Sequence, residues 1–246
     1  MSFRYKIIIE YDGTSFYGWQ QQDGVPTVQQ HLQEAILALS KKPIVMYGSG
    51  RTDAGVHALG QVAHFNLDRD IEPFRVQECM NAYLREVPIV VLSAERVSND
   101  FDARFSTKER AYIYKILNRR ARPALLQNRC WHMMLHLDEQ SMNDVAQHLI
   151  GKHDFSAFRA AGCQALSPIK TLNCINVWRE GDMIYVECRA KSFLYHQVRN
   201  IVGSLFMVGA GRWNEQKFLD VFASGDRNIA GQTAPACGLY FKEVVY

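Results

Sequence analysis

The sequence has no long apolar run and no cysteine spacing typical of a zinc site. Hydrophobic residues make up 48% of its 246 residues, yet no stretch approaches the ~18 to 20 continuous apolar residues of a membrane span. Residues 1–13 lack the apolar region and cleavage site of a signal peptide. None of the six cysteines forms a CxxC pair, which disfavours a disulfide framework. We therefore expect a cytoplasmic protein without a membrane anchor.

A strong excess of charge of either sign is also missing. The chain has 28 Lys and Arg against 25 Asp and Glu, which gives a net charge of +3. Many nucleic-acid-binding proteins are far more basic. One local cluster stands out, and both a solvated loop and a phosphate-contacting patch remain open as its interpretation. Its members are Lys115, Arg119, Arg120, Arg122 and Arg129.

The first half of the chain alternates between strand-like and helix-like segments. The pattern predicts a strand at 5–11, a helix at 28–39, strands at 44–47 and 61–67, a helix at 73–84 and a strand at 89–97. Thr27 is a candidate N-cap for the first helix, with Gln30 three residues later as in a capping box. The glycine-rich stretch 48–57 joins the two central strands.

The second half repeats this order. We expect a strand at 111–117, a helix from the Asp138 cap to residue 150, a hairpin of strands 172–178 and 183–190, a long helix at 195–208, a short helix after Asn214 and a strand at 239–245. Each half thus reads strand-helix-strand-strand-helix-strand, the order of the split βαβ motif. The predicted fold class is α+β, with two tandem ferredoxin-like domains, 1–104 and 105–246, whose antiparallel sheets pack around a central cleft.

The stretch GSGRTDAGVH at 48–57 places one carboxylate, Asp53, among three glycines. Glycines permit unusual backbone angles and the close approach of a ligand backbone. The stretch is not a Walker loop, because no Lys-Ser/Thr pair follows the glycines. No second acid lies nearby to form a pair for glycoside hydrolysis. Two interpretations remain, a capping aspartate in a tight turn and a reactive carboxylate kept ionised by a cation such as Arg51.

GSGRTDAGVHALGQVAHF at 48–65 closely resembles the signature of the tRNA pseudouridine synthase I family (TruA). Further blocks resemble the family's other motifs in the same order over nearly the whole chain. They are IEYDGTSFYGWQQQ, FDARFSTKERAYIYKI, HDFSAFR, FLYHQVRNIVG and GLYFKEVVY. The resemblance implies an enzyme that isomerises uridines 38 to 40 of the tRNA anticodon stem-loop to pseudouridine, as a homodimer, with base flipping and without a cofactor or metal.

The resemblance also implies roles for individual residues. Asp53 matches the family's catalytic aspartate, and Arg199 matches a basic residue that pairs with it. Tyr112 matches a tyrosine that stacks on the target base, and Leu239 an apolar residue of the pocket. Arg51 matches an arginine linked to flipping the nucleotide. The sequence pattern alone would make Tyr112 an ordinary strand tyrosine, with one of Tyr112 and Tyr114 facing the core and the other facing outward.

Two other functions are consistent with parts of the sequence. A non-catalytic RNA-binding module would share the ferredoxin-like order, but the aromatic RNP1 pattern of such domains is missing. A metal-dependent phosphohydrolase or nuclease could use Asp53, His57 and His64, although a lone histidine at such a place is usually structural.

Overall fold

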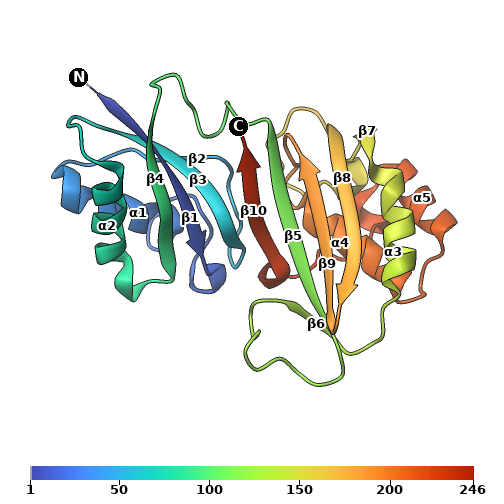
Figure 1. The fold of residues 1–246 in the computed structure, drawn as a ribbon. Helices are drawn as coiled ribbons and strands as arrows, with labels where there is room; N and C mark the ends of the chain where they lie inside the picture. Colours follow the sequence, from blue (N-terminus) through green and yellow to red (C-terminus); the bar gives the residue numbers. More distant parts are fainter. Residues whose placement is uncertain (1) are drawn as a thin grey trace. The chain divides into compact units, whose positions relative to one another are not determined.

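The computed structural model describes residues 2–246 and has an α+β fold with mostly antiparallel strands (Figure 1). The α+β class predicted from the sequence is confirmed. The chain divides into two compact units, one comprising Met1–Lys108 with Tyr240–Tyr246 and the other Glu109–Leu239. The last seven residues therefore pack with the first unit although they follow the second in sequence. Within residues 2–246, every helix is too short or too polar to cross a bilayer.

The first unit is a sheet with two helices packed against each other. Its strands lie in the order β4-β1-β3-β10, and β2 pairs with β3. All pairings are antiparallel except the parallel one between β3 and β10. The elements are β1 (Phe3–Tyr11), α1 (Val28–Ser40), β2 (Tyr47–Gly48), β3 (His57–Leu67), α2 (Pro73–Tyr83), β4 (Ile89–Val97) and β10 (Leu239–Val245).

The alternating pattern of β1 explains why this sheet has one covered face. Tyr5, Ile7, Ile9 and Tyr11 are buried, whereas the residues between them are more exposed. Successive strand residues point to opposite faces, so these four side chains share the face on which α1 and α2 lie. The apolar residues of α1 at helical spacing, such as Leu32 and Ile36, complete this core.

The second unit is built in a similar way. Its strands lie in the order β5-β9-β8-β7, and β6 pairs with β5 in parallel. The helices gather on one side of the sheet, where α3 packs on β8 and α4 on β5 (Figure 1). The elements are β5 (Glu109–Asn118), β6 (Trp131–Met133), α3 (Glu139–Ala146), β7 (Gly151–Asp154), β8 (Ile169–Glu180), β9 (Met183–Ala190), α4 (Gln197–Gly209) and α5 (Glu215–Ser224).

Local sequence signals set the ends of several elements in this unit. The side chain of Asp138 accepts a hydrogen bond from the backbone N–H of Ser141 at the start of α3, as an N-cap does. Asn214 caps α5 in the same way, and Gly225 ends that helix with a positive φ. Gly181, with φ +57°, makes the turn of the β8–β9 hairpin. The Asp138 cap, the helix after Asn214 and the hairpin were predicted from the sequence, whereas the helix end at Gly225 was not.

Other boundaries differ from the sequence prediction. The strand predicted at 44–47 is only β2, Tyr47–Gly48, whereas β3 begins at His57 and not at 61. The start of β3 is a strand because His57 and Ala58 pair with Tyr240 and Phe241 of β10. Residues so distant in the chain leave no local signal. The short strands β6 and β7 were not predicted for the same reason.

Candidate active site

Asp53 lies in the loop between β2 and β3, and this loop holds its side chain at the surface. The carbonyl oxygen of Asp53 accepts the N–H of Val56 at 3.1 Å, which closes a tight turn. Gly55 adopts φ +77° within this turn, a conformation that favours glycine. Asp53 is partly exposed, and Arg51 in the same loop is exposed. Both predicted residues are thus accessible to a large ligand.

Buried polar side chains hold the same loop from below. The hydroxyl groups of Tyr11 and Thr52 lie 2.7 Å apart. Gln61 accepts a hydrogen bond from the hydroxyl of Ser49 at 2.5 Å and donates one to the carbonyl of Gly50 at 2.9 Å. Burial raises the pKa of Tyr11 well above its usual value, so its hydroxyl stays protonated. The backbone on the N-terminal side of Asp53 is therefore fixed by groups that are themselves enclosed.

The segment that follows β1 packs directly on this loop. The backbone N–H of Trp19 donates to the carbonyl of Thr52 at 3.0 Å, and the N–H of Gly55 donates to the carbonyl of Phe16 at 3.3 Å. Gly18, at φ +93°, lies so close that a Cβ there would be 2.6 Å from the carbonyl oxygen of Thr52. The segment 16–19 thus runs alongside residues 52–55 and holds the loop on one side.

The packing of Trp19 explains why position 48 is a glycine. A Cβ on Gly48 would be 2.6 to 2.7 Å from the buried indole ring of Trp19. The prediction that the glycines admit a ligand backbone is therefore wrong for Gly48, where a side chain of the protein fills the space. Trp19 lies in the block IEYDGTSFYGWQQQ, so that resemblance was the signal that could have pointed to it.

The two histidines of the alternative metal site have structural roles. Nδ1 of His57 accepts the N–H of Gly13 at 3.0 Å, and its ring stacks on Tyr240. Nδ1 of His64 accepts the N–H of Ala103 at 3.1 Å. Both rings are buried. Within residues 2–246, no group of three His, Cys, Asp or Glu side chains is arranged to hold a metal ion. The geometry gives the phosphohydrolase hypothesis no support.

Arg199 lies in the first turn of α4 in the second unit, where a loop from further along the chain holds it. Nε of Arg199 donates to the carbonyl of Ala234 at 2.8 Å, and the N–H of Ala234 donates back to the carbonyl of Arg199 at 3.1 Å. Arg227 fixes this loop by donating to the carbonyl of Gly231 and the hydroxyl of Thr233. The guanidinium of Arg199 is thus held in one orientation.

Tyr112 and Leu239 also belong to the second unit. The ring of Tyr112, partly exposed on β5, meets Phe193 edge-on at 5.1 Å between ring centres. Leu239 is buried. A Cβ on Gly238, the residue before it, would lie 2.5 Å from the ring of Tyr114. The prediction that Tyr112 and Tyr114 face opposite sides was wrong, because residues two apart on a strand share a face. They differ in depth, and Tyr114 is the buried one.

The structure brings Asp53 and Arg51 together in one loop of the first unit, and it places Tyr112, Arg199 and Leu239 in the second. Sequence reasoning missed the supporting residues Tyr11 and Gln61, which no local pattern distinguishes from ordinary strand residues. Their importance depends on pairing: Tyr11 lies opposite Ala58, and Gln61 opposite Ile9.

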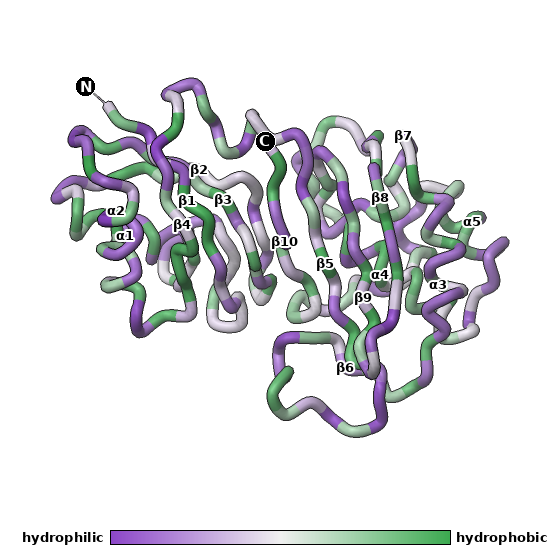
Figure 2. Tube along the Cα trace, in the orientation of Figure 1, coloured by the Kyte–Doolittle hydropathy of each residue, from purple (hydrophilic) through white to green (hydrophobic). Residues whose placement is uncertain are grey.

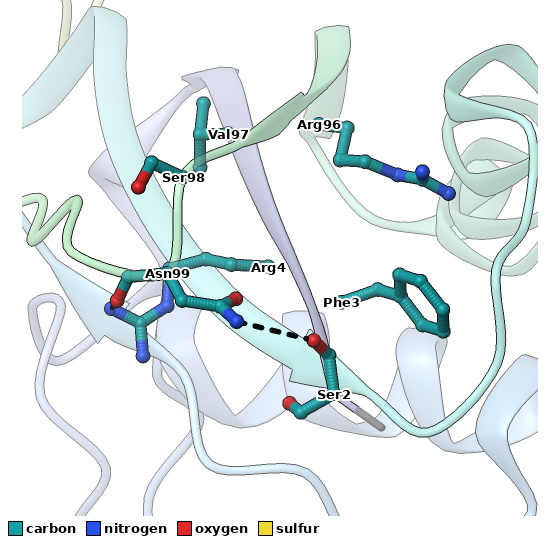
Figure 3. Close-up of a pocket in the computed structure, with 7 residues that line it drawn as sticks. All are labelled: Ser2, Phe3, Arg4, Arg96, Val97, Ser98 and Asn99. Carbon is teal, nitrogen blue, oxygen red and sulfur yellow. Dashed lines mark hydrogen bonds between the residues drawn. The ribbon is translucent and has the colours of Figure 1, made fainter.

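A hollow of about 510 Å³ lies elsewhere in the first unit, between the start of β1 and the end of β4 (Figure 3). Its two arginines serve the fold. Arg4 donates to the carbonyl of Phe101 at 2.7 Å, and Arg96 lies over the ring of Phe3 and pairs with Asp70. The predicted site residues do not line this hollow.

The basic cluster lies mainly in the connection between β5 and β6, which mixes hydrophilic and hydrophobic stretches (Figure 2). Arg119 pairs with Asp182 at 3.3 Å, and Arg129 donates to the carbonyl of Leu125. Arg120 and Arg122 are exposed. Arg129 thus stabilises its own loop, and Arg119 joins that loop to the turn between β8 and β9.

Comparison with known proteins places these residues in a family. The family described as tRNA pseudouridine synthase matches residues 7–106 and 145–246. Proteins named tRNA pseudouridine synthase A are 52% identical, one from Azorhizobium caulinodans over 99% of this chain and 94% of its own length, and one from Rhodospirillum rubrum over 98% and 87%. A chain in a crystal structure of a Cbf5-Nop10-Gar1 complex is only remotely similar, with a TM-score of 0.34 and 10% identity over 82% of this chain and 54% of that one. The chain belongs to the tRNA pseudouridine synthase family.

Proposed function

We propose that the protein isomerises uridine to pseudouridine in tRNA, and that Asp53 carries the reaction. The observation that supports this most directly is the family match, combined with the partly exposed Asp53 in a rigidly held loop. In the reaction the bond from uracil N1 to ribose C1′ breaks, the base turns, and C5 bonds to C1′. The proton of C5 is lost and N1 gains one. No electrons are exchanged with a partner and no group is added, so the chemistry requires no cofactor.

Asp53 has to be ionised to act as a nucleophile or as a base. We assign Arg199 to pair with it, a role that rests on the family resemblance because the two residues belong to different units. Such a pair holds a carboxylate charged and fixes its direction. The reciprocal bonds between Arg199 and Ala234 support this role, since they leave the arginine little freedom to turn away.

The target nucleotide has to leave the helical stem before the reaction, which costs a few kcal/mol. Stacking of the uracil on Tyr112 would return about 1 to 3 kcal/mol. The exposed Arg51 lies in the same loop as Asp53. There it would fill the space left by the base or contact a phosphate, while the buried Leu239 would form an apolar wall. The substrate positions, by resemblance, are 38 to 40 of the anticodon stem-loop.

The finer architecture belongs to the same proposal. In the first unit, the order β4-β1-β3 with β2 beside β3 fits a ferredoxin-like split βαβ fold, and β5, β8 and β9 with α3 and α4 fit it in the second. The N-terminal domain would carry Asp53 and the C-terminal domain would complete the site. A cytoplasmic homodimer is the form that the family resemblance implies.

Mapping of pseudouridine in an unmodified tRNA transcript after incubation with the purified protein tests this function. We expect new pseudouridines at positions 38 to 40. Modification at other positions would correct the substrate assignment, and a transcript that stays unmodified would refute the proposed activity. Measurement of how tightly Tyr112→Phe binds the same transcript separates the role of the ring from that of the hydroxyl. Stacking needs only the ring, so RNA binding should survive this change.

A non-catalytic RNA-binding protein is the remaining alternative. It would bind the transcript with equal affinity in the wild-type and Asp53→Asn forms and modify it in neither.

A further inference from the structure

Tyr17 is an exposed aromatic residue in a segment whose neighbours are packed. Its side chain is 58% exposed, whereas Phe16 and Trp19 are 4% and 2% exposed. A large aromatic ring so accessible to water is unusual next to two buried ones. Within residues 2–246, no other ring contacts it. More than half of Tyr17 is therefore open to solvent.

The backbone around Tyr17 is fixed on both sides. Its N–H donates to the carbonyl of Pro26 at 2.9 Å, and its carbonyl accepts a hydrogen bond from the side chain of Gln22 at 3.1 Å. The carbonyls of Gly18 and Trp19 then accept the first N–H groups of α1. These bonds satisfy donors that the side chain of Thr27 leaves uncapped. The backbone of segment 16–19, from which the ring projects, is thus held in place by hydrogen bonds.

The same segment, residues 16–19, lies against the loop of Asp53. Two backbone hydrogen bonds flank Tyr17 and join its segment to that loop, from the N–H of Gly55 to the carbonyl of Phe16 at 3.3 Å and from the N–H of Trp19 to the carbonyl of Thr52 at 3.0 Å. Since consecutive Cα atoms are ~3.8 Å apart, Tyr17 lies one residue from the first of these bonds and two from the second. Its backbone is therefore held close to the loop of the candidate catalytic carboxylate within the same unit.

We infer that Tyr17 is a second stacking surface for the RNA, which holds a base next to the uridine that reacts. This inference rests on the proposed function, in which the target base occupies Tyr112. An RNA strand that brings its uridine to Asp53 has to pass over the surface around the loop. Arg51 gives that surface positive charge for phosphates, and Tyr17 offers a ring to a base. A tyrosine held by its backbone loses little conformational freedom when it binds.

The test measures how tightly RNA binds as a function of salt. Tyr17→Ala should weaken binding of an anticodon stem-loop RNA on the order of 5- to 150-fold, the range for loss of one stacked base. Tyr17→Phe should keep the wild-type affinity. The slope of log affinity against log salt should be unchanged in Tyr17→Ala, because no charge is removed, and shallower in Arg51→Ala. Fluorescence anisotropy with a labelled hairpin gives all these values.

Tyr83 supplies a matched control. It lies at the end of α2 in the same unit and is 55% exposed, so Tyr83→Ala removes an equally accessible ring elsewhere. An affinity of Tyr17→Ala within twofold of wild type would overturn the inference, as would an equal loss in Tyr83→Ala. Light scattering adds a further check. If Tyr17→Ala weakens RNA binding only because copies of the chain separate, the ring is a contact between copies and the inference is wrong.

Turnover distinguishes this inference from the proposed function. A base held beside the target contributes the same binding before and during the reaction, so Tyr17→Ala should raise KM and leave kcat nearly unchanged. A wild-type protein that binds RNA through Tyr17 but forms no pseudouridine would refute the proposed function alone. An active protein that is indifferent to Tyr17 would refute this inference alone.

Discussion

The hydroxyl groups of Tyr11 and Thr52 lie 2.7 Å apart beneath the loop that carries Asp53. Tyr11 ends the first strand of the chain, and Thr52 immediately precedes the candidate catalytic residue. Both are buried. A bond between enclosed hydroxyl groups is costly to break, because neither group can turn to water instead. This contact thus links the core of the first unit to the position of the carboxylate.

Tyr11→Phe removes that bond and keeps the ring. The hydroxyl of Thr52 would lose this buried partner, so we expect a loss of about 1 to 3 kcal/mol in the free energy of unfolding. We also expect a lower kcat, because the backbone beside Asp53 is less firmly held. Urea unfolding and turnover measure the two effects. Tyr83→Phe, at an exposed position, is the control that should change neither, and a Tyr11→Phe protein with wild-type values would contradict the proposed support.

Gly48→Ala places a methyl group against the ring of Trp19. Because the new Cβ would lie 2.6 to 2.7 Å from buried ring atoms, the indole or the loop has to move. Overpacking of this kind costs about 1 to 3 kcal/mol, and turnover should fall with it. Gly24→Ala is the comparison: Gly24 has φ +78° but nothing within 4 Å of its Cβ position. That variant should lose some stability through backbone strain and keep its kcat.

His64 should make the stability depend on pH. Burial lowers the pKa of His64 below its usual value of 6.5, and its Nδ1 accepts the N–H of Ala103. Below pH 6.5, His64 therefore becomes protonated in the unfolded chain, whereas in the folded protein it stays neutral until the pH reaches its lowered pKa. The free energy of unfolding should fall as the pH drops below 6.5 towards the lowered pKa.

The variant His64→Asn isolates this effect, because an amide oxygen can replace Nδ1 as acceptor without titrating. Denaturation of both proteins between pH 7.5 and 5 gives the comparison. The wild-type protein should lose more stability over this interval than the variant. Parallel curves would show that His64 does not contribute.

Arg227→Gln should impair turnover more than RNA binding. Arg227 holds the loop whose Ala234 makes reciprocal bonds with Arg199. Loosening that loop would let Arg199 turn away from the carboxylate with which we propose it pairs, and this would lower kcat. Single-turnover kinetics and hairpin binding separate the two quantities. An equal loss in both would mean that Arg227 supports RNA binding and does not position Arg199.

The sequence predicted those features that depend on near neighbours. The alternation in β1, the cap at Asp138 and the turn at Gly181 are local patterns, and the structure has each of them. The family resemblance selected Asp53 from several acids, which spacing alone could not do. What the sequence could not show depends on distant pairing. The start of β3 needs β10, and the role of Gly48 needs Trp19.

The start of α1, just after Thr27, also depends on distant residues that the sequence could not reveal. Thr27 stands at the predicted N-cap position, but its side chain makes no capping bond, and its hydroxyl has no hydrogen-bond partner in the structure of residues 2–246. The carbonyls of Gly18 and Trp19 serve the helix instead. A sequence motif identified the boundary correctly, whereas the atoms that cap the helix come from residues 18 and 19, whose segment packs on the loop of Asp53.

The central claim is that the carboxylate of Asp53 is required to convert uridine to pseudouridine. The two nucleosides have the same mass, so the direct measurement is the release of tritium from C5 of uridine in labelled tRNA. With wild-type protein we expect release, and with Asp53→Asn we expect none, although that variant should still bind the tRNA. Release by Asp53→Asn at a rate close to wild type would contradict the account.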